Sequence, residues 1–302
     1  MKEAFIKLHV SVLIAGATGI FGRLISLNEG LLVWYRMLFA TVMFFLLLWM
    51  LGKLKRVSFR DVCKIGSVGM LLAIHWLFFY GSIKVSNVSI GVVCLSLMSF
   101  FTALFEPLIN RHRISLGEIA CSLIGVLGII LIFHFDTRYR LGIGMGILSS
   151  ALASLFTICN KKVSVGYTSS TMLMYEMGGG FLGLSCLLPL YLSFFPVASI
   201  LPSLIDFVYL LLFASVCTVL LYILQIQVLK KISAFTFNLT YNLEPIYSII
   251  AAMFLFHEAK ELNASFYVGL GLILFSVLLH SAGVFLQSKS KPFFSLFVKW
   301  KH

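Results

Sequence analysis

The side chains of this sequence that could do chemistry are ionisable groups inside long apolar stretches. Glu244 stands near the middle of one stretch and directly precedes Pro245, and His75 stands near the middle of another. Because proline breaks the helical hydrogen-bond pattern, a carboxylate beside it could bind a cation, a substrate ammonium group or a coupling proton. The structural alternatives are a protonated Glu244 that is hydrogen-bonded to Tyr241 or Asn242, and a neutral core histidine.

A second pair of charged residues occurs at corresponding places in the two halves of the chain. Tyr35-Arg36-Met37 resembles Tyr175-Glu176-Met177, and both triplets begin several residues inside an apolar stretch. Arg36 could hold a substrate carboxylate, and Glu176 could hold an amine or a proton. The structural alternative is that each ties neighbouring helices together. The sequence leaves open whether the two side chains pair directly.

Aromatic residues accompany these ionisable groups. Trp76 and Tyr80 follow His75 in the same stretch, while Trp34 and Tyr241 stand near Arg36 and Glu244. They could line the apolar part of a binding site, although interface anchoring and core packing are equally ordinary uses of these residue types. The candidate binding residues are Glu244, His75, Arg36, Glu176, Tyr241, Asn242, Trp76 and Tyr80, with Pro245 as a helix break.

The composition indicates which elements must position these groups. Hydrophobic residues make up 60% of the 302 residues, charged residues only 11%, and the mean hydropathy is +1.04. Such a chain must face lipid, where only helices and closed barrels satisfy the backbone, and barrel strands would alternate in polarity. Ten apolar segments are long enough to predict membrane-spanning helices. They are 8–27, 30–51, 63–82, 86–109, 117–134, 141–159, 170–194, 204–228, 232–256 and 264–286.

The distribution of Lys and Arg predicts the orientation of these spans. Placing the loops on alternating sides puts 17 basic residues on the side of both termini and 5 on the other, with Arg36 inside a span. Positively charged loops stay in the cytoplasm, so we expect both termini there, in a multi-pass protein of the cell (inner) membrane. The net charge of +12 is therefore a topology signal, and the partners expected are the lipid bilayer and a small metabolite rather than nucleic acid.

Short internal similarities predict a duplicated architecture. Lys84-Val85-Ser86 precedes the fourth segment much as Lys230-Lys231-Ile232-Ser233 precedes the ninth. Because each half has an odd number of spans, five, the second copy must enter the membrane from the opposite side, which gives an inverted repeat. We expect repeats at 1–137 and 138–286 and a basic, aromatic cytoplasmic tail at 287–302.

The residues that carry these features also resemble a known family, the EamA transporters of the drug/metabolite transporter superfamily. The resemblance rests on Gly16-x-x-Gly19-x-Phe21-Gly22, Trp34-Tyr35-Arg36, His75-Trp76-x-x-Phe79-Tyr80-Gly81-Ser82, Tyr241-Asn242-Leu243-Glu244-Pro245, Phe256-His257-Glu258 and Gly269-Leu270-Gly271. It implies a carrier of ten helices in two inverted five-helix repeats. The first half departs from the pattern, because Leu97-Met98 stand where the second half has Glu244-Pro245.

Other function classes lack a matching pattern in the sequence. HExxH, GxSxG, Cys/His metal spacing and an ATP-binding motif are absent, so we predict no enzyme, no metal and no cofactor. An intramembrane enzyme is the less favoured alternative, because its conceivable nucleophile Ser67 and His75 would be about 12 Å apart along one helix, too far for a direct hydrogen bond. We expect a secondary transporter of small metabolites, such as amino acids or amphipathic compounds, that works by alternating access and is proton-coupled, solute-coupled or uncoupled. The alternative is a non-transporting membrane sensor or scaffold, and a homodimer is left open.

Overall fold

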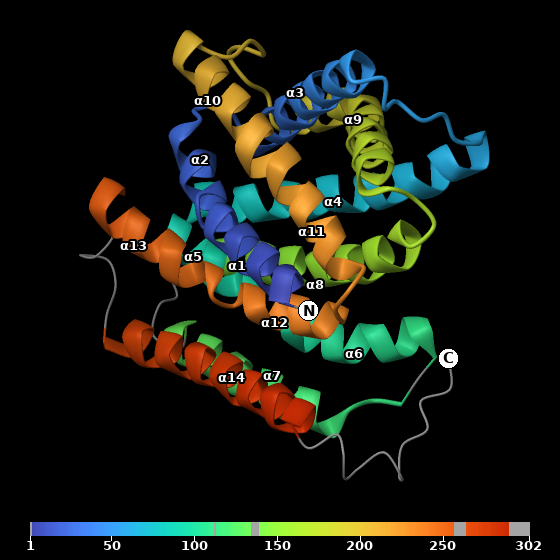
Figure 1. Ribbon diagram of the computed structural model, residues 1–302. Helices are drawn as coiled ribbons and strands as arrows, with labels where there is room; N and C mark the ends of the chain where they lie inside the picture. Colours follow the sequence, from blue (N-terminus) through green and yellow to red (C-terminus); the bar gives the residue numbers. More distant parts are fainter. Residues whose placement is uncertain (1, 112, 134–138, 257–263, 290–302) are drawn as a thin grey trace.

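The computed structural model describes residues 2–111, 113–133, 139–256 and 264–289, and these residues form helices without any strand (Figure 1). The helices of the first half are α1 (Lys2–Gly16), α2 (Thr18–Leu24), α3 (Glu29–Met50), α4 (Phe59–Val85), α5 (Val88–Leu95), α6 (Met98–Asn110) and α7 (Leu116–Phe133). Those of the second half are α8 (Arg140–Ser164), α9 (Ser169–Phe194), α10 (Leu204–Ala214), the π-helix η2 (Ser215–Leu220), α11 (Leu221–Leu229), α12 (Ala234–Tyr241), α13 (Glu244–Phe256) and α14 (Ala264–Lys289). The predicted all-helical fold is confirmed for the described part of the chain.

Eight helical segments of the described chain are long and apolar enough to cross a membrane. Each coincides with one of the predicted spans. Two shorter apolar helices, Leu116–Leu131 in α7 and Tyr267–Ser276 in α14, overlap the predicted fifth and tenth spans but are too short to count as spans by themselves. The protein is therefore a polytopic helical membrane protein, while ten spans and the orientation of the termini remain predictions. The tail beyond Lys289 and the His257-Glu258 motif lie outside the described residues.

Polar caps start the helices where the sequence changes from loop to apolar segment. The side chain of Asn87 accepts a hydrogen bond from the backbone N–H of Ile90, and Ser233 accepts one from Thr236. These caps satisfy N–H groups that have no partner within the helix. The two caps begin the fourth and ninth spans, which the sequence pairs as repeats, so the two spans enter the bundle in the same local way.

Both of these spans are interrupted near their middle. The fourth span breaks at Ser96 and Leu97, between α5 and α6, and the ninth breaks at Asn242 and Leu243, between α12 and α13. We expected the break at Pro245, but the interruption comes just before Glu244. Proline is well tolerated in the first turn of a helix, where its missing N–H has no intrahelical acceptor. The first half breaks at the corresponding place without a proline.

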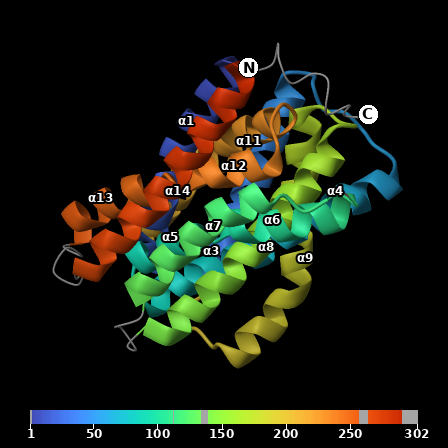
Figure 2. The same ribbon diagram turned by 90° about the horizontal axis from the view of Figure 1, so that it is seen from below.

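The arrangement of the helices brings the two halves together. Helix α4 packs against α8 and α9, α5 packs against α13, and α6 packs against α12. The two interrupted spans thus lie against each other at the middle of the bundle. Helices α7 and α14 pack together along one edge of the molecule (Figures 1 and 2).

The contact between α4 and α9 depends on glycine. A Cβ atom at Gly69 would overlap the carbonyl oxygen of Glu176, and one at Gly179 would overlap the backbone of Gly66. The run of glycines after Glu176 therefore permits the close backbone approach that small residues allow between membrane helices.

Candidate functional site: a central cavity

A cavity of about 60 Å³ lies where the two halves meet, and residues of both halves line it. Its lining comes from α1 to α6 of the first half and from α8, α11, α12 and α13 of the second. This volume has room for a few water molecules. A metabolite of several carbon atoms requires a wider form of the same cavity.

Arg36 contributes a buried positive charge to the cavity wall. The side chain is 1% exposed, and its Nε donates to Thr218 Oγ1 at 2.7 Å, its Nη1 to Tyr80 Oη at 2.6 Å and its Nη2 to the carbonyl of Cys217 at 2.7 Å. The guanidinium lies 3.6 Å from the ring centre of Trp76 and 4.1 Å from that of Phe213. Arginine has five N–H donors, so hydrogen-bonding capacity remains for a ligand.

The π-helix η2 supplies two of these Arg36 partners. Cys217 and Thr218 lie in Ser215–Leu220, where the helix widens between α10 and α11. Such π-helical turns change the backbone hydrogen-bond pattern and recur at functional sites. Here the turn directs a carbonyl and a hydroxyl toward a cation from the other half of the protein.

Glu244 contributes a carboxyl group without a partner. It is 4% exposed, it lines the cavity, and no hydrogen bond or salt bridge joins its carboxyl group to another described residue. It is the first residue of α13, directly after the break at Asn242 and Leu243. A buried carboxyl group in this situation is expensive unless it is protonated or meets a ligand.

His75 lines the same cavity, and Ser149 of α8 fixes the orientation of its ring. Its Nδ1 lies 2.9 Å from the carbonyl oxygen of Ser149 and 2.9 Å from Ser149 Oγ, so α8 orients the ring. An Nδ1–H that donates to the carbonyl would leave Nε2 as an acceptor. Ser67, the other half of the conceivable catalytic pair, is exposed and bonds to the carbonyl of Lys64, so the structure does not bring Ser67 and His75 together.

Aromatic side chains form the remaining wall. Trp76 donates from Nε1 to Tyr222 Oη at 3.1 Å, and the two rings meet edge to face. Tyr241 Oη accepts from Gln225 Nε2 at 2.7 Å and donates to Ser11 Oγ at 2.9 Å. The cavity is therefore walled by aromatic surface and carries a guanidinium group and a separate carboxyl group.

Not every predicted residue reaches the cavity. Glu176 is fully buried and accepts a hydrogen bond from Asn160 Nδ2 at 2.7 Å, away from the cavity lining. Asn242 lies in the break beside the cavity, and Trp34 donates to Ser185 Oγ elsewhere. Among the described residues no salt bridge joins Arg36 to Glu176; the partners of each are different groups. The predicted residues that the cavity brings together are Glu244, His75, Arg36, Tyr241, Trp76 and Tyr80.

Sequence reasoning missed five polar residues of the cavity, namely Thr18, Thr157, Tyr222, Gln225 and Asn238. Gln225 and Asn238 are uncharged amides inside apolar spans. Their polarity in such spans was the sequence signal that could have identified them as cavity residues. Charge singled out most of the predicted residues in the apolar spans, whereas an uncharged amide in lipid also needs a partner.

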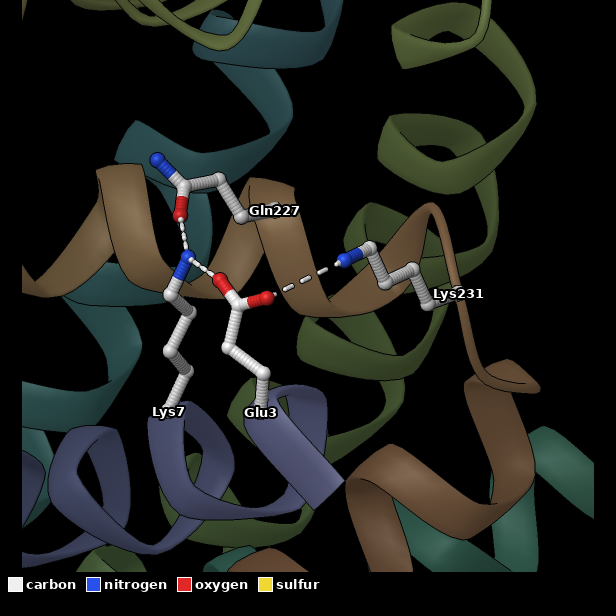
Figure 3. A network of polar contacts seen from close by, with 4 residues as sticks. All are labelled: Glu3, Lys7, Gln227 and Lys231. Atoms are coloured by element: carbon white, nitrogen blue, oxygen red, sulfur yellow. Dashed lines mark hydrogen bonds and ion pairs between the residues drawn. The ribbon is translucent and has the colours of Figure 1, made fainter. Parts of the chain in front are cut away.

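Polar contacts join the two halves of the bundle at each of its two ends. At the end that holds the N-terminus, Lys7 of α1 pairs with Glu3 at 2.6 Å and donates to Gln227 of α11 at 2.7 Å, and Lys231 Nζ lies 3.9 Å from Glu3 (Figure 3). The other end is hollowed to a volume of about 770 Å³. There Asp206 of α10 accepts hydrogen bonds from the backbone N–H and the hydroxyl of Ser26, at 2.8 and 2.6 Å.

Comparison with known proteins places this architecture in a family. The model of the EamA-like transporter family matches residues 4–134 and, separately, residues 140–282. Over 160 residues the chain is 28% identical to YxxF, an uncharacterized transporter of Bacillus subtilis (strain 168), a match that covers 51% of each protein. Over 137 residues it is 23% identical to an uncharacterized transporter of Archaeoglobus fulgidus, covering 45% of this chain and 49% of that one. Each of these matches thus spans about half the length of the curated relative.

A solved crystal structure shares the fold. The two structures superpose with a TM-score of 0.67 over 91% of this chain and 96% of the other, at 13% sequence identity. At that identity the likeness concerns the fold alone, which need not fix the substrate.

Proposed function

Because the chain belongs to the EamA-like transporter family, a part of the drug/metabolite transporter superfamily, we propose that it is a secondary carrier of small zwitterionic or amphipathic metabolites, amino acids among them. Membership of this family, together with the apolar helices, identifies the chain as a multi-pass membrane transporter. The family and the transporter names of its relatives point away from an enzyme.

One observation carries the proposed substrate class. The cavity holds a cation, Arg36, and an unpartnered carboxyl group, Glu244, and these two groups have no salt bridge to each other. A zwitterion would place its ammonium group at Glu244 and its carboxylate toward the remaining N–H groups of Arg36. The aromatic wall around Trp76 would contact an apolar side chain or ring of the substrate. This arrangement selects a small molecule with both charges and an apolar body.

We propose that this carrier works by alternating access, because a polar contact joins the two halves at each end of the bundle. Opening toward the N-terminal end requires separating Lys7 from Gln227, and opening toward the other end requires separating Ser26 from Asp206. Each contact joins the first half to the second, so rocking the halves breaks one while keeping the other. We place the N-terminal end, with the C-terminus, in the cytoplasm of a cell-membrane protein because the positive loops lie there.

Proton coupling, solute coupling and uncoupled flux remain the three mechanisms to separate. If transport is proton-coupled, Glu244 or His75 should bind the proton, because both are titratable and line the cavity. The pH dependence of flux should then flatten in Glu244→Gln or in His75→Gln. An unchanged pH profile in both variants would exclude them as coupling groups.

A thermal-shift screen tests the proposal with a matched control. We expect a neutral amino acid to raise the melting temperature of the purified protein, since a ligand that binds only the folded state stabilises it. The shift should vanish in Glu244→Gln and persist in Glu176→Gln, because both glutamates are buried in spans and only Glu244 lines the cavity. Stabilisation that survives Glu244→Gln would refute the proposed site. No stabilisation by any amino acid would favour the sensor or scaffold alternative.

A further inference from the structure

Glu176 and Asn160 form a buried polar pair that the proposed substrate site does not use. Glu176 lies on α9 and is fully buried, and Asn160 lies on α8 and is 1% exposed. Asn160 Nδ2 donates to Glu176 Oε1 at 2.7 Å, whereas Glu176 Oε2 and Asn160 Oδ1 have no hydrogen-bond partner in the described part of the chain. Each side chain of the pair therefore has one bonded polar atom and one buried oxygen without a partner.

Both unpaired atoms are acceptors when Glu176 is ionised. A carboxylate oxygen and an amide oxygen each need a donor, and neither can supply one to the other. A proton on Glu176 changes this, because a carboxylic acid has an O–H donor as well as an acceptor. The acid and the amide can then share two hydrogen bonds, one from Asn160 Nδ2 and one from the carboxyl O–H to Asn160 Oδ1. Buried polar atoms are normally paired, so this arrangement favours the protonated acid.

No positively charged group contacts the Glu176 carboxyl group among the described residues. Helices α3, α4 and α11 pack against α9. Their buried ionisable side chains are joined to Glu176 by neither a hydrogen bond nor a salt bridge; they are Tyr35 and Arg36 on α3, His75 and Tyr80 on α4, and Tyr222 on α11. On α8, Lys161 donates to the carbonyl of Ile232, and Lys162 is exposed. An isolated carboxylate in an apolar bundle is costly, and taking up a proton removes that cost.

The pair lies where the two halves of the protein touch. Helix α4 of the first half packs against both α8 and α9, and a Cβ atom at Gly69 of α4 would overlap the backbone carbonyl oxygen of Glu176. Tyr222, which lines the central cavity, lies within electrostatic range of the Glu176 carboxyl group. Movement of α4 away from α9 would admit water to the pair, and a charge formed there would act on the wall of the cavity.

We propose that Glu176 and Asn160 form a proton-binding site outside the substrate cavity. Glu176 holds the proton while α4 covers the pair, and it exchanges the proton with water when the two halves separate at this contact. The site is additional to Glu244 and His75, which line the cavity itself. Proton binding by Glu176 does not depend on what the protein carries, whereas coupling of this proton to substrate movement rests on the proposed function.

Infrared spectroscopy of the purified protein tests proton binding without any substrate. A carboxylic acid has a carbonyl band that a carboxylate lacks, so the wild type at neutral pH should show an acid band that is missing in Glu176→Gln. The control is Glu106→Gln, because Glu106 accepts from the backbone N–H of Phe235, lies near Lys161 and is therefore expected to be ionised. This control should leave the acid band unchanged.

A second variant tests the pairing with the amide. In Asn160→Leu the acid band should persist but shift in frequency, because the carboxylic acid loses its hydrogen-bond partner. Identical acid bands in the wild type and Glu176→Gln would overturn the proposal in favour of a carboxylate that is paired with an ordered water. A band that keeps its frequency in Asn160→Leu would also contradict the proposed site, since Asn160 would then not bind the acid.

Proteoliposomes that contain a pH-sensitive dye test the coupling. As a neutral amino acid that stabilises the protein moves into the vesicles, wild type and Glu106→Gln should change the internal pH. Glu176→Gln should still exchange labelled amino acid but lose most of the pH change. A pH change that is unaltered in Glu176→Gln would overturn the coupling role. If the acid band is present and no amino acid moves, the proton site stands and the proposed substrate fails, so the two failures are distinct.

Discussion

The fourth and ninth spans share a backbone and differ in chemistry. Both begin at a capped helix, both break near the middle, and both contribute to the wall of the central cavity. After its break the ninth span continues with Glu244 and Pro245, whereas the fourth continues with Met98 and Ser99. The structure thus shifts by one residue the match of Leu97-Met98 with Glu244-Pro245 that the sequence suggested. The repeated fold therefore creates two similar helix interruptions, and only the one in the ninth span is followed by a carboxyl group. We therefore expect ligand recognition in this cavity to be asymmetric even though the scaffold is duplicated.

The second and seventh spans show the same separation of scaffold and chemistry. Arg36 and Glu176 stand at corresponding positions, but Arg36 faces η2 and the cavity while Glu176 faces Asn160 of α8. The difference arises because the neighbouring surfaces are not duplicated: a π-helix meets one position and a regular helix meets the other. Substitutions at matched positions should therefore have unequal effects.

The largest effect is expected at Arg36. Arg36→Lys keeps the charge but cannot reproduce three hydrogen bonds and a planar contact between two aromatic rings. We expect a loss of about 3 kcal/mol in the free energy of unfolding, because partners buried with the guanidinium are left unpaired. Thermal or denaturant unfolding in detergent measures it. A loss below that of Glu176→Gln would contradict the structural role assigned to Arg36.

The next effect is expected on ligand binding at Glu244. Glu244→Gln removes the negative charge and should weaken a stabilising amino acid at least tenfold, which corresponds to about 1.4 kcal/mol. Met98→Leu, beside the matching break, should leave the affinity within a factor of about two because it conserves apolar volume. Titration of the melting temperature with the amino acid gives both affinities. Equal losses in the two variants would mean that the breaks act through packing alone.

A smaller effect is expected where the two broken spans are joined. Asn238→Ala removes hydrogen bonds to Thr102 and Thr157 and should lower the free energy of unfolding by about 1–2 kcal/mol. Thr240→Ala is the control, because within the described part of the chain its hydroxyl bonds only to the carbonyl of Thr236 in its own helix. If both variants lower the free energy of unfolding equally, the hydrogen bonds of Asn238 do not hold the two spans together.

The smallest effect is expected at Glu176. Glu176→Gln keeps an oxygen that can accept from Asn160 Nδ2, so stability should change by less than about 1 kcal/mol. Substrate stabilisation should also persist, since Glu176 does not line the cavity. Loss of ligand stabilisation in this variant would return Glu176 to the binding site that the sequence suggested.

The sequence predicted the elements better than it predicted which way their side chains face. Long apolar runs located the helices, and the cost of burying charge singled out Glu244, His75 and Arg36, all of which line the cavity. The same cost singled out Glu176, which does not line the cavity. A charged group in an apolar span can face a cavity or an amide on the next helix, and the sequence does not distinguish the two. The break at Ser96 had no proline to mark it, and only the structure revealed it.

Solute counterflow in proteoliposomes tests the central claim most directly. Vesicles loaded with an unlabelled neutral amino acid that stabilises the protein would be diluted into the same labelled amino acid. A carrier whose cavity opens to each side in turn should accumulate label transiently, and Glu244→Gln vesicles should lose most of that signal. Wild-type vesicles that accumulate no more label than protein-free vesicles, despite binding the amino acid, would contradict alternating access and identify the protein as a sensor or scaffold.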